Sequence, residues 1–229
     1  MHTALVTGGS AGLGLALTRA LVARGVTVVT DGRSPDTLAR IDSPGVRAVV
    51  GDVADPDHRA ALVSEVGAIG GLDLLVHNAS TLGPLPMRAV RDLTAADLHA
   101  AWQVNVAAPL ELTRALLPTL RDRDGVVLSV TSDAAVEHYP TWGAYAATKS
   151  ALEHLTLTLA AEEGLTAYAV DPGDMRTRMH QDAFPGEDIS DRPEPETVVP
   201  SLLALLDRRP PPGRYRAADL AVPTEVASR

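Results

Sequence analysis

Short apolar stretches alternate with longer helical patterns along this chain of 229 residues. Six of the short stretches predict strands, because each is a near-continuous apolar run instead of an alternation of apolar and polar positions. They are Thr3–Thr7, Val26–Thr30, Val46–Val50, Leu72–Val76, Val126–Thr131 and Leu165–Asp171. Continuous runs are typical of strands that helices cover on both faces of a parallel sheet.

The longer stretches between these runs have the periodicity of helices. The predicted helices are Gly12–Arg24, Asp55–Ala68, Thr94–Leu120, Trp142–Glu163 and Pro195–Leu206, and Arg214–Ala217 is a candidate for a short closing strand. This alternation predicts an α/β, doubly wound Rossmann fold, with three αβα layers around a mostly parallel seven-stranded sheet. We expect one domain over residues 1–229, with an irregular loop at 174–195 that shapes the substrate site.

Composition and charge exclude several classes of protein. The chain has no cysteine, which excludes disulfides, and its histidines lack metal-ligand spacing, so we expect no metal. It has neither an apolar run of the roughly 20 residues that span a bilayer nor a visible signal peptide, so we expect a cytoplasmic protein. The net charge of −9 disfavours nucleic-acid binding.

A glycine-rich turn joins the first predicted strand to the first helix. Gly8, Gly12 and Gly14 allow the backbone to turn tightly and to approach a pyrophosphate, which the N–H groups of the new helix can bind. The spacing differs from the commonest dinucleotide fingerprint, and it lacks the lysine of a nucleoside triphosphatase loop. The turn therefore favours dinucleotide binding over ATP hydrolysis.

The end of the second strand indicates which dinucleotide binds. A carboxylate there binds the ribose 2′-hydroxyl of NAD, whereas an arginine accommodates the 2′-phosphate of NADP. The usual carboxylate position falls on Gly32, and Arg33 follows it directly, so we expect NADP(H). NAD(H) stays possible because Asp31 is also present. Asp52, after the third strand, is a candidate acceptor for the adenine amino group.

Tyr145 and Lys149 lie four residues apart on one face of a predicted helix. An ammonium about 4 Å from the phenol stabilises the phenolate by roughly 4 kcal/mol, which corresponds to lowering its pKa by up to ~3 units. The pair is therefore a candidate general acid/base. Ser132 lies 13 residues before Tyr145 at the carboxyl end of a strand, where ligands of open α/β sheets bind.

The motifs in this order resemble those of the short-chain dehydrogenase/reductase family, in its compact single-domain branch. They are Thr7–Gly14, His77-Asn78-Ala79-Ser80, Asn105, Ser132, Tyr145 with Lys149, and Pro172-Gly173 with Thr177. The resemblance implies that Tyr145 moves a proton to or from the substrate oxygen and that Ser132 hydrogen-bonds the same oxygen. It implies that Lys149 lowers the pKa of Tyr145 and holds the nicotinamide ribose, and that Asn105 keeps a water that relays protons to Lys149.

The same resemblance implies the cofactor contacts. The pyrophosphate would contact Gly8, Ser10, Gly12, Leu13 and Gly14, and the adenosine end would contact Arg33, Asp52 and Val53. The adenosine ribose would lie near Asn78 and Ala79. The nicotinamide would lie against Pro172, Gly173, Met175 and Thr177. Family members pair through the helices at Thr94–Leu120 and around Tyr145, so a homodimer or homotetramer is implied.

Some positions stay open in the sequence. Asp133 follows Ser132, where a small uncharged residue is more usual, so it either tunes the substrate site or faces solvent. Met175, Met179 and Phe184 either form an apolar lid over the substrate or only pack beside it. His138 and Tyr139 either contact substrate or pack in the loop, whereas Trp102 and Trp142 are assigned to the core or to subunit contacts.

Three functions are consistent with these residues. The first is a reversible NADP(H)-dependent oxidoreductase that reduces a ketone or aldehyde, with Tyr145 as the general acid/base. The second is an NAD-linked alcohol dehydrogenase that uses Asp31, and the third is a non-catalytic, cofactor-binding regulatory protein. A nucleotide-sugar epimerase is disfavoured, because 229 residues leave no room for a second substrate domain.

Overall fold

A seven-stranded sheet forms the centre of the computed structural model, which describes residues 1–41 and 43–220. The strands are β1 (Thr3–Val6), β2 (Thr27–Gly32), β3 (Val46–Val50), β4 (Leu74–His77), β5 (Val126–Val130), β6 (Thr166–Asp171) and β7 (Gly213–Arg216). They lie in the order β3-β2-β1-β4-β5-β6-β7, and every neighbouring pair is parallel. The doubly wound fold expected from the sequence is confirmed, and the described sheet is parallel throughout.

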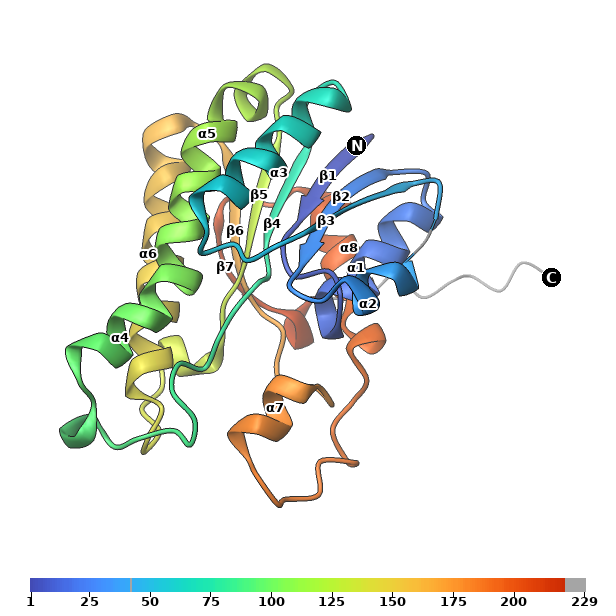
Figure 1. The fold of residues 1–229 in the computed structure, drawn as a ribbon. Helices are drawn as coiled ribbons and strands as arrows, with labels where there is room; N and C mark the ends of the chain where they lie inside the picture. The colour runs from blue at the N-terminus through green and yellow to red at the C-terminus, as the bar shows by residue number, and fades with distance from the viewer. Residues whose placement is uncertain (42, 221–229) are drawn as a thin grey trace.

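Helices cover both faces of the sheet (Figure 1). On one face lie α1 (Gly12–Ala23) and α8 (Val199–Arg208), and on the other lie α3 (Pro56–Ala68), α5 (Ala108–Asp122) and α6 (Gly143–Glu163). The shorter helices are α2 (Pro35–Leu38), α4 (Ala95–Trp102) and α7 (Arg178–Ala183). Figure 1 shows α7 set apart from these layers, below the ends of the strands.

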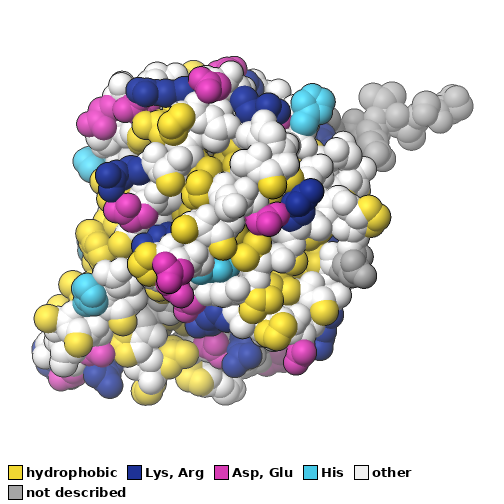
Figure 2. Space-filling model, turned by 45° about the horizontal axis from the view of Figure 1, so that its top comes forward, with side chains coloured by type: hydrophobic (Ala, Val, Ile, Leu, Met, Phe, Trp, Pro, Cys, Tyr) yellow, Lys and Arg dark blue, Asp and Glu magenta, His cyan; other side chains and the backbone are white. Residues whose placement is uncertain are grey.

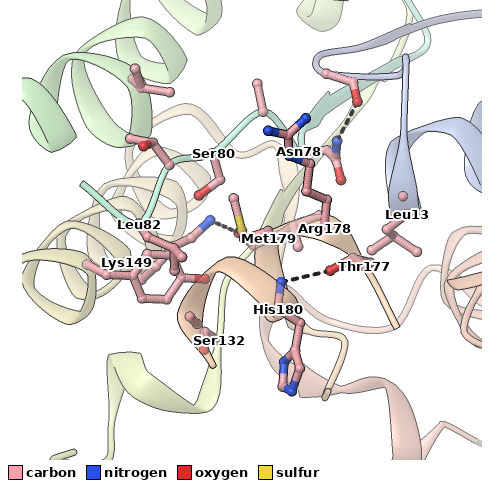
Figure 3. A pocket seen from close by; sticks show the side chains of 18 of the residues that line it. Leu13, Asn78, Ser80, Leu82, Ser132, Lys149, Thr177, Arg178, Met179 and His180 are labelled. Atoms are coloured by element: carbon pink, nitrogen blue, oxygen red, sulfur yellow. Dashed lines mark hydrogen bonds between the residues drawn. The ribbon is translucent and has the colours of Figure 1, made fainter. Parts of the chain in front are cut away.

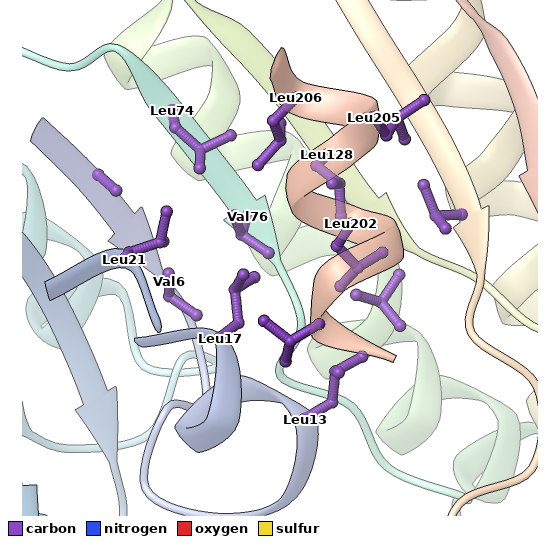
Figure 4. Packing of buried hydrophobic residues seen from close by; sticks show 14 of the residues in the cluster. Val6, Leu13, Leu17, Leu21, Leu74, Val76, Leu128, Leu202, Leu205 and Leu206 are labelled. Atoms are coloured by element: carbon purple, nitrogen blue, oxygen red, sulfur yellow. The ribbon is translucent and has the colours of Figure 1, made fainter. Parts of the chain in front are cut away.

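The apolar core is mainly aliphatic, as an aromatic content of only 3% requires, with Tyr168 as a fully buried aromatic member. In Figure 4, leucines of α1 and α8 meet above β1, β4 and β5; the labelled residues are Val6, Leu13, Leu17, Leu21, Leu74, Val76, Leu128, Leu202, Leu205 and Leu206. A second cluster fills the other face, with Leu62 of α3 and Leu116 of α5 in its centre. These two layers cover the two faces of the sheet beneath the site.

Three local expectations need correction. The strand β3 is not covered on both faces, because it is the edge strand and Val50 is 52% exposed. The helix predicted at Thr94–Leu120 is interrupted by a π-helical turn at Gln103–Ala107. The loop at 174–195 contains α7, and Pro195–Thr197 forms a separate 3₁₀ turn ahead of α8.

The winding of the sheet determines where a ligand can bind. The chain winds outward from β1 to β3, returns to β4 beside β1, and then continues to β7. The crevice at the carboxyl ends of β1 and β4 is the ligand position of such sheets. Most of the residues expected to bind the cofactor, together with Ser132, lie in the segments that directly follow these strands. Tyr145 and Lys149 reach the same edge from α6.

The surface carries charges of both signs. On the face shown in Figure 2, arginine side chains are interspersed with aspartate and glutamate side chains. None of the described helices has both the length and the apolar content that a bilayer span requires. The cytoplasmic location expected from the sequence stays a prediction, and residues 221–229 of the C-terminal tail lie outside the described residues.

Candidate active site

The glycine turn after β1 is pressed against the turn after β4. Gly8 has a φ of +68°, and a Cβ on it would lie 2.9 Å from the Cα of Ala79. Asn78 donates from Nδ2 to the carbonyl oxygens of Thr7 (2.8 Å) and Gly8 (3.2 Å). A Cβ on Gly14 would lie 2.5 Å from the Gly8 oxygen. The turn therefore needs glycine at positions 8 and 14, and the two hydrogen bonds from the Asn78 amide hold its backbone in place.

The first turn of α1 is open to an anion. Its N-cap, Ala11, offers no side-chain hydrogen bond, and the turn contains no acidic residue. Helix N-termini carry unpaired N–H groups and a partial positive charge of roughly half a unit. This geometry fits the diphosphate of a dinucleotide, because the glycines leave the backbone accessible and the first turn of α1 carries no carboxylate of its own.

A cavity of about 680 Å³ runs from this turn along the strand ends to α7. Every site residue expected from the sequence lines it except Gly14 and Asn105. Asp52 and Val53 both line the cavity. The Oδ1 atom of Asp52 accepts from the Ala54 N–H at 2.9 Å, and Val53 is almost fully buried. The structure thus brings the expected residues together, while the contacts of each with a cofactor stay predictions.

The end of β2 separates the roles of two candidate residues. Asp31 is fully buried, and its carboxylate oxygens bind the Gly8 N–H at 2.6 Å and His58 Nε2 at 3.0 Å. A Cβ on Gly32 would lie 2.7 Å from the Cβ of Ser10, which leaves no space for a carboxylate there. Arg33 is exposed and lines the cavity. Asp31 also lines the cavity and supports the glycine turn through these bonds, so the choice between NADP(H) and NAD(H) stays a prediction.

Tyr145 lies near the start of α6, with its side chain 7% exposed at the cavity wall. Its ring packs edge-on against Trp142, with the centroids 5.6 Å apart. Burial raises the pKa of Tyr145 above its ordinary value, the nearby Ser132 hydroxyl lowers it, and the carboxylates of Asp133 and Asp171 raise it further. The phenol therefore keeps its proton at neutral pH.

Lys149 lies one helical turn further along α6, only 1% exposed. Its ammonium group donates to the carbonyl oxygen of Val130 at 2.8 Å and lies 5.6 Å from the centre of the Tyr145 ring. Burial lowers the pKa of Lys149 to about 7. Burial thus leaves the lysine only part of its charge at neutral pH, and the role expected for it, lowering the pKa of Tyr145, stays a prediction.

Ser132 follows β5 and is held by its neighbour. Its hydroxyl donates to Asp133 Oδ1 at 2.9 Å and accepts from the Ala134 N–H at 3.1 Å. The other oxygen of Asp133 accepts from the Tyr139 hydroxyl at 2.8 Å. Asp133 thus faces the site and orients Ser132, and Tyr139 acts through Asp133 without lining the cavity. His138 is exposed and also lies outside the cavity lining.

Asn105 lies in the π-helical turn between α4 and α5, fully buried. Its Oδ1 accepts from the Ser80 hydroxyl and the Thr81 N–H, and its Nδ2 donates to the Thr81 oxygen and to Thr148 Oγ1. All four hydrogen-bonding positions of this amide are therefore taken by protein groups. The expected relay water has no place on the side chain, so any such role would have to use the backbone of this residue.

The segment after β6 closes the far end of the cavity. Gly173 donates from its N–H to Asp171 Oδ1 at 3.0 Å, and the side chain of Thr177 caps α7. Met179 and Ala183 of α7 pack with Leu82 against the ring of Tyr145. The interpretation of this loop as an apolar cover is consistent with that packing, because Met175 and Met179 line the cavity. Phe184 stacks behind, 5.9 Å from Trp142.

Sequence reasoning missed several residues at the site. Trp142 was expected in the core or at a subunit contact, but it lines the cavity beside Tyr145. Arg214 of β7 donates to the Ser132 carbonyl oxygen at 3.2 Å and lies 3.5 Å from Asp171 Oδ2, so it ties two strand ends together. Nothing in the sequence marks an isolated arginine on a closing strand for this role. Trp102, in contrast, is 40% exposed at the end of α4.

Comparison with known proteins decides the family. The family model described as short chain dehydrogenase matches residues 2–188. The chain belongs to the short-chain dehydrogenase family. Members of this family are NAD(P)-dependent oxidoreductases, so the cavity that joins the glycine turn to Tyr145 has the composition expected of a dinucleotide and substrate site.

Individual members of the short-chain dehydrogenase family show how far the likeness extends. A short chain dehydrogenase of Pseudocercospora fijiensis is 35% identical over 193 residues, which cover 77% of this chain and 60% of that protein. L-xylulose reductase of Bos taurus is 33% identical over 90% of this chain and 89% of its own length. The crystal structure of a short chain dehydrogenase from Escherichia coli CFT073, complexed with NADPH, is 30% identical over 94% of this chain and 96% of that chain, with a TM-score of 0.85. The chain thus spans 60% of the length of the first of these relatives.

Proposed function

We propose that this short-chain dehydrogenase is an NADP(H)-dependent oxidoreductase that reversibly reduces a ketone or aldehyde to an alcohol. The observation that carries the proposal is the position of Tyr145. It keeps its proton through burial and lies in one cavity with Ser132, Lys149 and the uncapped end of α1. A protonated phenol beside a dinucleotide cradle suits the reduction of a carbonyl group.

Reduction needs a hydride at the carbonyl carbon and a proton at the carbonyl oxygen. The reduced nicotinamide supplies the hydride when it is bound. Tyr145 donates its hydroxyl proton to the oxygen, so that the C=O double bond becomes a C–O single bond carrying that proton. In the reverse direction the phenolate of Tyr145 accepts the proton of the alcohol. Positioned proton transfer of this kind typically contributes about 10²- to 10⁴-fold to a rate.

Ser132 and Lys149 assist this transfer. The hydroxyl of Ser132 lies at the cavity wall and can turn from Asp133 to donate to the carbonyl oxygen as negative charge develops there. With its pKa near 7, Lys149 can pick up and release a proton at neutral pH. Once Tyr145 has given up its proton, a protonated Lys149 stabilises the phenolate across the short distance between them.

The end of β2 favours NADP(H). Arg33 provides a permanent positive charge at the cavity edge, and the contact between Gly32 and Ser10 leaves no room for a carboxylate that would repel a 2′-phosphate. The NAD-linked alternative requires Asp31, whose two carboxylate oxygens already hydrogen-bond to the Gly8 N–H and to His58. The solved relative from Escherichia coli CFT073 is complexed with NADPH, which agrees with this preference.

We propose that the chain forms a homodimer or homotetramer. Large apolar side chains are exposed on the helices at the edge of the molecule that carries α4, α5 and α6, among them Trp102, Leu110 and Leu155. Aliphatic and aromatic groups exposed on adjacent helices favour association, because each contact removes apolar surface from water.

A panel of ketones and aldehydes, followed by the loss of NADPH absorbance, tests the proposed reaction. We expect turnover with at least one carbonyl class and a faster reaction with NADPH than with NADH. A protein that binds NADPH but turns over no carbonyl compound and oxidises no alcohol would support the non-catalytic alternative. Preference for NADH would instead support the NAD-linked dehydrogenase.

A further inference from the structure

The helix α7 begins beside the start of α1. A Cβ on Gly12, the first residue of α1, would lie 3.4 Å from Cγ2 of Thr177, the residue that precedes α7. The proposed diphosphate position at the N-terminus of α1 is therefore bordered by α7 on its open side. A side chain at the start of α7 can reach that position without any movement of the sheet.

Arg178, the first residue of α7, has the length and the direction for this contact. It lines the cavity, and Figure 3 shows its side chain extending into the cavity on the side of Asn78 and Leu13, whereas the ring of His180 extends the other way. The side chain is 92% exposed, and its closest carboxylate, Asp182, lies 3.8 Å away, too far for a hydrogen bond. Its guanidinium group is thus available to a ligand.

The cavity has few positive charges near the proposed diphosphate position, and Arg178 supplies one. Among the described residues that line it, aspartates outnumber the lysine and arginine side chains, which are Arg33, Lys149 and Arg178. Lys149 donates to Val130 at the base of the site, and Arg33 lies at the end of β2. A diphosphate carries two negative charges, whereas a helix N-terminus offers only about half a positive charge.

We propose that Arg178 binds the diphosphate of the nicotinamide dinucleotide and so couples cofactor binding to the position of α7. The planar guanidinium can donate two parallel hydrogen bonds to phosphate oxygens, a geometry that favours arginine over lysine. Because α7 also carries Met179 against Tyr145, a cofactor held by Arg178 fixes the wall of the substrate site. The inference rests on the proposed dinucleotide binding.

NADPH and NADH share the diphosphate, so loss of a contact to it should weaken the binding of both cofactors. Dissociation constants of both are measured by fluorescence titration for the wild-type protein and for Arg178→Gln. We expect the variant to bind both cofactors more weakly by a similar factor, roughly ten- to a hundredfold, as for a lost hydrogen bond to a charged group. Thermal unfolding of the variant should be unchanged, since the side chain is exposed.

Two matched variants serve as controls. Arg176→Gln removes the same charge from the same segment, but Arg176 pairs with Glu194 and does not line the cavity, so both affinities should persist. Arg33→Ala should weaken NADPH alone. Unchanged affinities in Arg178→Gln, or a loss for NADPH only, would overturn the assignment of Arg178. Failure of the wild-type protein to bind either dinucleotide would contradict the proposed function itself.

Discussion

Burial sets the proton chemistry of the central side chains. It raises the pKa of Tyr145 and lowers the pKa of Lys149 to about 7, so both groups favour their neutral forms. The sequence could predict that these two residues and Ser132 meet, because their spacing places them on one helix face and at a strand end. It could not predict the directions of the pKa shifts, which depend on how deeply the fold buries each group.

Asp133 offers a test of the electrostatics at Tyr145. The carboxylate disfavours the phenolate, so Asp133→Asn should lower the pKa of Tyr145 while the amide oxygen still accepts from Ser132 and Ala134. In alcohol oxidation, where Tyr145 acts as a base, we expect the rising limb of the pH profile of kcat/KM to move to lower pH. Glu137→Gln removes the same charge from an exposed neighbour and should leave the profile unchanged. Coincident profiles for all three proteins would contradict this role of Asp133.

The buried lysine predicts a pH-dependent stability. Lys149 titrates at about 7 in the folded protein, against an ordinary value of 10.5 in the unfolded chain. Between these pH values the unfolded chain binds one more proton at Lys149 than the folded protein does. Burial of Lys149 therefore lowers the free energy of unfolding, and this destabilisation becomes smaller as the pH rises and larger as the pH falls. From pH 7 to pH 9 the stability of the wild type relative to Lys149→Met should rise by roughly 2 kcal/mol. Denaturant unfolding at both pH values measures this, and an identical pH dependence in the two proteins would contradict it.

At the scale of elements, periodicity was a reliable guide to the central strands and the long helices, because their apolar faces are buried in two continuous layers. It failed where tertiary contacts decide the conformation. The π-helical turn forms where the buried amide of Asn105 binds Ser80, Thr81 and Thr148, and α7 forms where Met179 packs against Tyr145. Neither contact leaves a local signal in the sequence.

Two glycine substitutions compare the constrained turn with an unconstrained helix. Gly14→Ala places a Cβ against the backbone of Gly8, so we expect a loss of roughly 1–3 kcal/mol in the free energy of unfolding, together with weaker NADPH binding. Gly67→Ala in α3 meets nothing within 4 Å and should gain about 0.5–1 kcal/mol. Chemical denaturation compares the two. Equal effects would show that the contact between Gly14 and Gly8 does not constrain the turn.

At the scale of the whole molecule, one edge of the sheet brings the glycine turn, Tyr145 and the segment with α7 together around one cavity. The alternation of elements predicted this arrangement. The sequence could not supply the shape of the substrate end, since that shape depends on how α7 packs against Trp142 and Leu82.

The exposed helix faces predict the state of assembly. We expect light scattering to give a mass that is a multiple of the single chain, and Leu110→Glu, which places a charge on α5, to yield monomers. Val50→Glu alters an even more exposed apolar residue on the edge strand β3 and should leave the mass unchanged. A monomeric wild type would refute the proposed oligomer, and an undisturbed oligomer in Leu110→Glu would exclude this face as the interface.

The most direct test of the account is the turnover of Tyr145→Phe with NADPH and an accepted carbonyl substrate. Loss of the hydroxyl should reduce kcat by at least about a hundredfold while NADPH binding persists, because the ring and its packing remain. Tyr139→Phe removes a hydroxyl that reaches only Asp133 and should retain most of the activity. Near-normal turnover by Tyr145→Phe would contradict the assignment of Tyr145 as the proton donor.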